Sequence, residues 1–328
     1  MIIVTGGAGF IGSALVWGLN EKLAVEDILI VDDLENEEKW KNLVKRRFSS
    51  IIGIESFLLW LHNPENLKKI SCIFHMGACS STTEKDMDYL LKNNTDYTVR
   101  LFDICQKNKI PFIYASSAAT YGDGLKGFSD SHELISELRP INPYGYSKQL
   151  ADRQILHRLD QGTFWCGLKF FNVYGPGEYH KKEMRSLIAK AFPQVRETGL
   201  MRLFKSYKKE FADGEQQRDF IYVKDVINMM LHIYEHHKNI PSGIYNVGTG
   251  KARSFLDLGK ALFRALELPQ KFEFISMPED IRNQYQYFTE ANMEKALSSI
   301  KYPHKMTSLE EGVLDYVQNY LRTADPYL

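Results

Sequence analysis

Short apolar runs alternate with longer helical patterns through the first half of the chain. The runs at 2–5, 27–31, 72–75, 111–115 and 165–171 are dominated by apolar side chains and do not alternate regularly with polar ones. A continuous apolar run is typical of a strand buried on both faces, and such strands belong to parallel sheets covered by helices. The pattern therefore predicts an α/β fold.

Helical periodicity fills the spaces between these runs. One helix is predicted from about Phe10 to Asn20, and a longer one from about Asp86 to Lys107, where apolar and aromatic side chains recur on one face. The segment from 43 to 54 shows no clear pattern. The repeated order of strand, helix and strand is that of a doubly wound parallel sheet.

Composition and charge exclude several classes of function. The 328 residues contain 41 Lys and Arg against 41 Asp and Glu, so no net positive charge favours nucleic acid or a membrane surface. The cysteines at 72, 79, 105 and 166 lack metal-binding spacing, which predicts no metal and free thiols in a reducing, cytoplasmic compartment. No signal peptide is expected, and no apolar run approaches the roughly 20 residues of a membrane-spanning helix.

A glycine loop, TGGAGFIG at 5–12, directly follows the first apolar run. Gly6, Gly9 and Gly12 allow a tight turn, close approach of the backbone to a pyrophosphate, and close packing of helix on strand. The pyrophosphate would lie at the N-terminus of the next helix, where free N–H groups point toward it. The loop predicts dinucleotide binding, and the alternative is an ordinary strand–turn–helix.

The chain changes character after the run at 165–171, because loops lengthen, lysines cluster and strands shorten. We predict a dinucleotide-binding Rossmann domain over 1–171 and mainly a smaller, interleaved α/β substrate-binding domain over 172–328. Elements near 219–250 are expected to return to the first domain, with 220–223 and 243–247 joining its sheet. Because no Pro- or Ser-rich linker separates the parts, we expect one folded unit.

Charged residues at the end of the second apolar run bear on the choice of cofactor. Asp32 follows that run about 20 residues after the glycine loop, which suits contact with an adenosine ribose. Asp32 and Asp33 favour the free 2′-hydroxyl of NAD. Lys39 would instead meet the 2′-phosphate of NADP, unless it is a solvated surface residue.

Ser117, Tyr144 and Lys148 form the candidate catalytic set. A phenol with a pKa of about 10 is a poor base near neutral pH, and a neighbouring ammonium group lowers that pKa. Lys148 would supply this charge and bind the nicotinamide ribose, while Ser117 would bind the reacting oxygen. Tyr144 would take a proton as hydride leaves carbon. By itself, the Tyr–Lys spacing also fits an ordinary surface pair on a helix.

With these motifs the chain resembles the nucleotide-sugar enzymes of the extended short-chain dehydrogenase/reductase superfamily over nearly its whole length. GACSSTT at 77–83 and EYHK at 178–181 are the specific segments, and they resemble epimerases of an ADP-linked heptose. The wider shared segments are FHMGACSSTTE at 74–84, LKNN at 91–94, ASSAATYG at 115–122, FNVYGP at 171–176, Met184, RDF at 218–220, YV at 222–223, NVGTG at 246–250 and YQ at 285–286.

The resemblance implies an isomerase that converts ADP-D-glycero-β-D-manno-heptose to its L-glycero epimer with tightly bound NADP⁺ or NAD⁺. Hydride would leave C6, the ketone would reorient, and hydride would return to the other face. Acid/base groups must then serve two orientations, and the resemblance assigns them to Tyr144 and Lys181. From spacing alone, Lys181 is a solvated charge beside Lys182.

The resemblance also implies binding roles. Positions expected around the cofactor are Gly6, Gly9, Phe10, Ile11, Gly12, Asp32, Asp33, Lys39, Met76, Gly77, Ala78, Cys79, Ser80, Asn93, Lys148, Val173 and Lys181. Positions expected around the ADP-sugar are Asn172, Phe204, Ser206, Arg218 and Tyr285. The Arg218 guanidinium would meet the diphosphate as a fork, and the alternative is a salt bridge with Asp219. A homo-oligomer, pentameric in the family, and a place in lipopolysaccharide core synthesis are implied by resemblance alone.

Some positions depart from the family pattern. Met76 stands where some members have Glu, Glu183 where a serine contacts substrate, and Lys190 where a histidine does, while 205–217 is longer. Glu183 and Lys190 are therefore not predicted as site residues.

Three other functions fit the sequence less well. A 4,6-dehydratase needs an acid pair beside the serine, where this chain has Ser117-Ala118-Ala119. A 4-epimerase needs no second base, and Lys181 argues against it. A non-catalytic dinucleotide sensor would not need the Ser–Tyr–Lys set.

Overall fold

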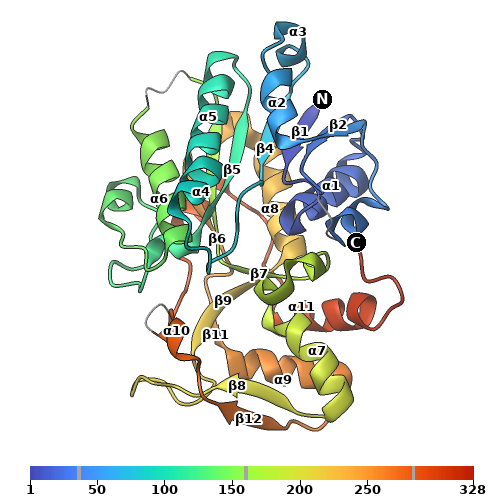
Figure 1. Ribbon diagram of the computed structural model, residues 1–328, viewed down its shortest axis with the longest axis vertical. Coiled ribbons are helices and arrows are strands. Elements are labelled where there is room, and N and C mark those ends of the chain that lie inside the picture. Colours follow the sequence, from blue (N-terminus) through green and yellow to red (C-terminus); the bar gives the residue numbers. More distant parts are fainter. Residues whose placement is uncertain (35–37, 159–161, 283–284) are drawn as a thin grey trace.

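The computed structural model describes residues 1–34, 38–158, 162–282 and 285–328. A seven-stranded sheet, parallel at every pairing, forms the upper part of the molecule in Figure 1. The α/β fold class predicted from the sequence is confirmed. In spatial order the strands are β10 (Gly243–Val247), β6 (Trp165–Phe170), β5 (Phe112–Ser117), β4 (Cys72–His75), β1 (Ile2–Thr5), β2 (Ile28–Val31) and β3 (Ser50–Ile52).

Helices cover both faces of this sheet because successive residues of a strand point to opposite sides. In β1, Ile2 and Val4 belong to one buried cluster and Ile3 to the other. Helices α1 (Phe10–Leu23) and α8 (Val223–His236) cover the first face and pack on each other. Helices α2 (Ile54–Trp60), α5 (Tyr97–Lys107) and α6 (Pro143–Leu156) contribute buried side chains to the second.

The lower part of the molecule in Figure 1 holds two small sheets. One is formed by β7 (Asn172–Tyr174), β9 (Gln217–Tyr222) and β11 (Ala252–Ser254), the other by β8 (Met201–Phe204) and β12 (Phe272–Ile275). The accompanying helices are α7 (Leu187–Thr198), α9 (Phe255–Leu266), α10 (Glu279–Arg282) and α11 (Leu309–Tyr316). Helices α3 (Pro64–Leu67) and α4 (Met87–Leu90) belong to the upper part.

One predicted strand is in a different sheet from the one expected. The run at 243–247 joins the main sheet as β10, as predicted, but 220–223 does not. Residues 220–222 belong to β9, which pairs with β7 and β11. Phe220 and Ile221 are buried in the same cluster as the first face of the main sheet, and burial alone does not say which sheet a strand joins.

Other predicted elements agree closely with the structure. The strand at 72–75 has the predicted bounds, and the first helix runs three residues beyond the predicted end. The pattern at 86–107 comprises α4, a wider helical turn at Leu91–Asp96, and α5. The unclear segment at 43–54 contains β3. Among the described residues, no helix combines the length and apolar character needed to cross a bilayer.

Candidate active site

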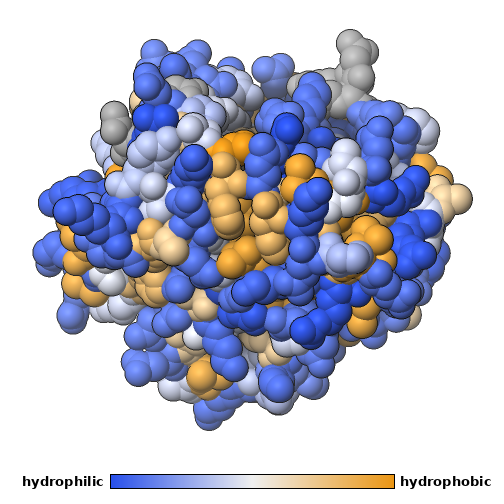
Figure 2. Space-filling model, turned by 90° about the horizontal axis from the view of Figure 1, so that it is seen from below, coloured by the Kyte–Doolittle hydropathy of each residue, from blue (hydrophilic) through white to orange (hydrophobic). Residues whose placement is uncertain are grey.

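A cavity of about 510 Å³ opens between the main sheet and the lower part of the molecule. Its lining includes the carboxyl end of β5, the loop after β4, strands β7 and β8, and the start of α7. Ligands of open parallel sheets bind outside the carboxyl ends of the strands, so this is the expected position of an active site. Seen from below, the lower face is largely hydrophilic, with apolar side chains gathered near its middle (Figure 2).

The glycine loop between β1 and α1 has no room for a side chain at Gly6 or Gly12. Gly6 has a φ of +64°, and a Cβ at Gly12 would lie 2.0 Å from the Gly6 carbonyl oxygen. Gly9 precedes α1 and offers no side-chain cap, which leaves N–H groups of the first turn available to an anion. Phe10 and Ile11 extend from this turn into the cavity. The loop therefore fits the pyrophosphate of a dinucleotide.

Asp32 lies directly after β2, almost fully buried against the glycine loop. Its Oδ2 accepts a hydrogen bond from the Ala8 amide at 2.9 Å, and its Oδ1 forms an ion pair with Lys39 Nζ at 2.9 Å. Asp33 is exposed and accepts a hydrogen bond from the Ile54 amide. Asp32 and Lys39 thus neutralise each other, and Lys39 is not a freely solvated charge.

Ser117, Tyr144 and Lys148 all line the cavity. Helix α6 begins at Pro143 because the Asn142 side chain caps it, accepting a hydrogen bond from the Gly145 amide at 2.7 Å. Tyr144 therefore lies in the first turn and Lys148 one turn later. A hydrogen bond joins Tyr144 to Ser117, and Lys148 Nζ donates to the Ala115 carbonyl at 2.9 Å. The structure brings the predicted set together.

Burial controls the acid–base state of this set. It raises the pKa of the Tyr144 phenol, although the hydrogen bond with Ser117 acts in the opposite direction. It also lowers the pKa of Lys148 to about 8, against the attraction of Asp152 one turn further along α6. The Tyr144 pKa is therefore raised, not lowered as we predicted from Lys148, because desolvation of the phenolate outweighs the hydrogen bond with Ser117.

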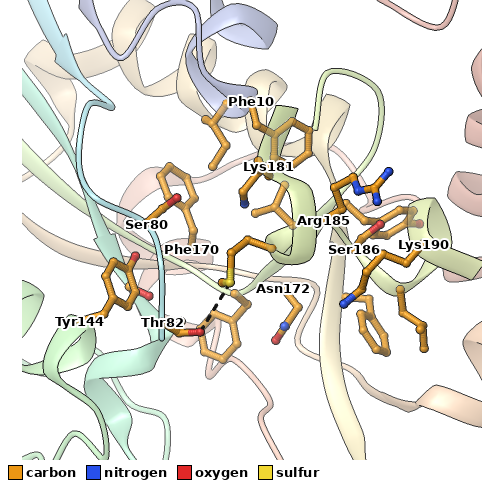
Figure 3. Close-up of a pocket in the computed structure, with 18 of the residues that line it drawn as sticks. Phe10, Ser80, Thr82, Tyr144, Phe170, Asn172, Lys181, Arg185, Ser186 and Lys190 are labelled. Carbon is orange, nitrogen blue, oxygen red and sulfur yellow. Dashed lines mark hydrogen bonds between the residues drawn. The ribbon is translucent and has the colours of Figure 1, made fainter. Parts of the chain in front are cut away.

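Lys181 extends into the cavity from the short helical segment Tyr179–Met184, while its neighbour Lys182 is exposed. Its Nζ lies 5.6 Å from the centre of the Phe10 ring. Burial lowers the Lys181 pKa, and the charge of Glu178 raises it. Tyr144 and Lys181 approach the cavity from different sides (Figure 3). Lys181 is therefore not a solvated surface charge.

Arg218 is buried between two aromatic rings. Its guanidinium carbon lies 5.5 Å from the centre of the Phe255 ring and 5.1 Å from that of Tyr285. The alternative salt bridge with Asp219 is absent, because the Asp219 carboxylate instead accepts hydrogen bonds from Thr249, Gly250 and Ala291. Nη1 donates to the Gln217 carbonyl. The guanidinium is thus positioned for an anion.

The other predicted residues divide into two groups. Gly77 packs against Gly6, the Cys79 amide is bound by Asn94, and the Asn93 side chain donates to the Tyr89 carbonyl, so these three do not line the cavity. The Ser206 hydroxyl bonds to the Lys208 carbonyl, also outside it. The predicted residues that do line it are Met76, Ala78, Ser80, Asn172, Val173, Phe204 and Tyr285.

A buried ion pair behind the candidate catalytic set was not predicted from the sequence. Asp152 and Lys169 are fully buried and 2.6 Å apart. Asp152 also accepts hydrogen bonds from Ser116 and Tyr114, and Lys169 donates to Thr120. The available signal was a Lys in the middle of the apolar run at 165–171.

Further cavity residues were missed on the side facing Lys181. Thr82 contacts Met184 across the opening, with 3.9 Å between hydroxyl oxygen and sulfur (Figure 3). Arg185, Lys190 and Arg202 add positive charge to the lining. Lys190 departs from the family pattern and was not predicted as a site residue, but it lines the cavity.

Comparison with known proteins defines the class. The model of the NAD dependent epimerase/dehydratase family matches residues 2–248, and the chain belongs to that family. Its curated relatives are more specific. It is 52% identical over 336 residues to the ADP-L-glycero-D-manno-heptose-6-epimerase of Fusobacterium nucleatum, with 100% of both chains covered. It is 50% identical over 330 residues to that of Nitratidesulfovibrio vulgaris, with the same coverage.

Solved structures show the same fold. The Helicobacter pylori ADP-L-glycero-D-manno-heptose-6-epimerase superposes with a TM-score of 0.79 at 29% identity, covering 97% of this chain and 95% of that one. A UDP-glucuronic acid 4-epimerase from Bacillus cereus, in complex with UDP-glucuronic acid and NAD, gives a TM-score of 0.74 at 25% identity, covering 97% and 99%. The predicted Rossmann-type fold and the resemblance are confirmed.

Proposed function

We propose that this protein is a nicotinamide-dependent epimerase that inverts C6 of an ADP-linked heptose, giving ADP-L-glycero-β-D-manno-heptose. The name shared by full-length relatives at 50–52% identity supports the substrate. The observation that carries the mechanism is the position of Tyr144 and Lys181, which reach one cavity from different elements. Inversion needs proton transfer to a sugar oxygen in two orientations, and this cavity offers two groups for it.

The residues of the chain have separate tasks. Bound NADP or NAD supplies hydride removal from C6 and hydride return to the opposite face. Ser117 holds the reacting oxygen, and Tyr144 accepts its proton in one orientation. Lys181 exchanges the proton in the other orientation. Lys148, fixed on the Ala115 carbonyl, contributes the positive charge beside Tyr144.

The sugar nucleotide is placed between the two parts of the molecule. Arg218 would form charge-assisted hydrogen bonds with the diphosphate, because a buried guanidinium lacking a carboxylate partner favours an anion. Asn172, Phe204 and Tyr285 would line the path of the ADP-sugar. Ser206 stays a proposed substrate contact, which requires its loop to move toward the cavity.

We propose NADP as the retained cofactor, one per subunit, with NAD as the alternative. Lys39 Nζ, paired with Asp32 at the end of β2, supplies a cation for a 2′-phosphate. Denaturing the purified protein and identifying the released dinucleotide by mass spectrometry tests this choice. NAD alone would contradict it and assign Asp32 to a free 2′-hydroxyl.

Three broader proposals rest mainly on the resemblance. The four free thiols favour a reducing cytoplasm. A homo-oligomer, pentameric by analogy, is tested by light scattering of the eluting protein, and a monomer would contradict it. A role in lipopolysaccharide core synthesis is tested by restoring the core in a bacterium that lacks its own heptose epimerase.

The decisive experiment follows ADP-D-glycero-D-manno-heptose by NMR with wild-type protein, Lys181→Met and the matched control Lys182→Met. We expect wild type and Lys182→Met to form the L-glycero epimer, and Lys181→Met to lose at least about 100-fold in rate. No conversion by wild type supplied with NADP⁺ and then NAD⁺ would refute the substrate. Full activity of Lys181→Met would refute only the role of Lys181.

A further inference from the structure

Glu178 is a buried carboxylate immediately before the segment that carries Lys181. Only 1% of its surface is exposed. Its Oε1 accepts hydrogen bonds from the Ser186 hydroxyl at 2.7 Å, the Tyr316 hydroxyl at 3.1 Å and the Gly175 amide at 3.3 Å. Its Oε2 accepts a hydrogen bond from the Ser186 amide. Four donors from three parts of the chain therefore meet on one side chain.

These contacts close the Lys181 segment into a loop. Glu178 precedes the segment and Ser186 follows it, so residues 179–185 begin and end at the same carboxylate. Ser186 is also the N-cap of α7, where its hydroxyl accepts a hydrogen bond from the Ala189 amide. Tyr316 connects the carboxylate to α11. Through Glu178, the segment that carries Lys181 is thus anchored to α7 and α11.

The backbone within this loop is strained. Lys182 has φ 49° and ψ −119°, a combination that non-glycine residues rarely adopt. Such a conformation persists only where surrounding contacts determine it. The paired ends at Glu178 and Ser186 provide that constraint, directly after the side chain that enters the cavity.

The charge of Glu178 also acts on Lys181. The titratable groups around the carboxylate are Lys181 and Tyr179 on the segment and Tyr316 on α11, while α7 contributes the uncharged Ser186. On the side of α1, Lys181 faces the apolar Phe10 ring. Burial raises the Glu178 pKa, and its hydrogen bonds with Ser186 and Gly175 lower it. The charge of Glu178 in turn raises the pKa of Lys181.

We propose that Glu178 is a positioning residue for Lys181, holding the ends of the 179–185 loop together and supplying the negative charge next to the lysine. The inference rests on the proposed role of Lys181 as the second acid/base group. Glu178 itself does not line the cavity, so it acts through Lys181 rather than on the sugar.

The test compares Glu178→Gln with Glu197→Gln, a matched change of an exposed acid on α7. The pH dependence of kcat and KM for C6 epimerisation is measured by NMR, with thermal unfolding and retained cofactor as checks on the fold. We expect Glu178→Gln to lower kcat about tenfold or more with KM nearly unchanged. One limb of the pH profile should disappear in Lys181→Met. In Glu178→Gln the same limb should move to lower pH, because the lysine loses the group that raises its pKa.

Wild-type kcat and an unmoved limb in folded Glu178→Gln would overturn the proposal while leaving the epimerase function intact. An inactive wild type, or an active Lys181→Met, would instead refute the proposed function. If Glu178→Gln does not fold, the double variant Ser186→Ala/Tyr316→Phe removes the two hydroxyl donors and keeps the charge. This double variant should lower kcat about tenfold, while the Lys181 limb of the pH profile stays at the wild-type pH. A wild-type kcat would again overturn the proposal.

Discussion

Three basic side chains near the cavity carry their charge in surroundings that disfavour it. Burial lowers the pKa of Lys148 to about 8, and it also lowers those of Lys181 and Arg218. A folded protein tolerates such groups where function requires them. We therefore expect each of these three side chains to lower the stability of the fold while it serves activity.

Lys148→Met should stabilise the protein and abolish activity. Below pH 8 the folded state contains a buried ammonium group whose usual pKa is 10.5. Desolvation of this charge lowers the free energy of unfolding. Between about 8 and 10.5 the unfolded chain binds more protons, and wild-type stability rises with pH. We expect the variant to gain about 1–3 kcal/mol in free energy of unfolding at pH 7, and less at pH 10. Urea unfolding at both pH values measures this, and a loss at pH 7 would show that the bond to Ala115 outweighs desolvation.

Arg218→Lys should weaken ADP binding without changing cofactor content. An ammonium cannot reproduce the two parallel hydrogen bonds of a guanidinium or its stacking between Phe255 and Tyr285. We expect the dissociation constant for ADP to rise about tenfold or more in calorimetry. Arg264→Lys is the matched control, since Arg264 is exposed on α9 and does not line the cavity. Equal effects at both positions would place the diphosphate elsewhere.

Among the secondary-structure elements, the Asp152–Lys169 ion pair joins α6, β6 and β5. Asp152 lies on α6 and Lys169 on β6, and their hydrogen-bond partners Ser116 and Thr120 lie on β5 and directly after it. Removing one member leaves a buried charge without its partner. Lys169→Met should therefore lower the free energy of unfolding by about 3–5 kcal/mol.

The double variant Asp152→Asn/Lys169→Met provides the control for the ion pair, because it leaves no unpaired charge. We expect it to regain most of the lost stability in urea unfolding. A double variant as unstable as Lys169→Met would mean that packing, rather than charge, determines the loss.

The glycine loop gives a second prediction at this scale. Gly12→Ala should lose bound cofactor, because its Cβ would lie 2.0 Å from the Gly6 carbonyl oxygen and the loop would have to shift. Gly127→Ala is the comparison: a Cβ there meets nothing within 4 Å, and its φ of +73° costs only about 1 kcal/mol. Absorbance of the released dinucleotide measures retention. A Gly12→Ala protein that keeps its cofactor would contradict the loop assignment.

Strands β1, β2, β4, β5 and β6 were predictable because each is a continuous apolar run followed by a turn or a helix, whereas the short, partly exposed β3 was not. The Ser–Tyr–Lys set was also predictable, since its residues lie at a strand end and on one helix. Lys190 departs from the family pattern, and Glu178 was recognised only as part of the EYHK segment. Asp152 was not assigned a role, because its partners Lys169, Ser116 and Tyr114 lie 17, 36 and 38 residues away and only the fold brings them together. The sheet of β9 was misjudged for the same reason.

For the whole molecule, the cavity depends on both parts of the chain at once. Tyr144 comes from the upper part, while Phe204 and Tyr285 come from the lower one. We propose that the division at 171/172 separates functions rather than folding units. Strand β10, from the second half of the sequence, completes the main sheet beside β6, and α8 covers α1.

The arrangement of β10 and α8 has a consequence for synthesis on the ribosome. Until Val247 has emerged, the nascent chain presents the open edge of β6, all six of whose residues are buried in the finished protein, and an uncovered apolar face on α1. A fragment of residues 1–171 should therefore accumulate in inclusion bodies or on chaperones, whereas the full chain is recovered after centrifugation. A stable, monomeric 1–171 fragment would show that the nucleotide-binding half folds before its last strand is made.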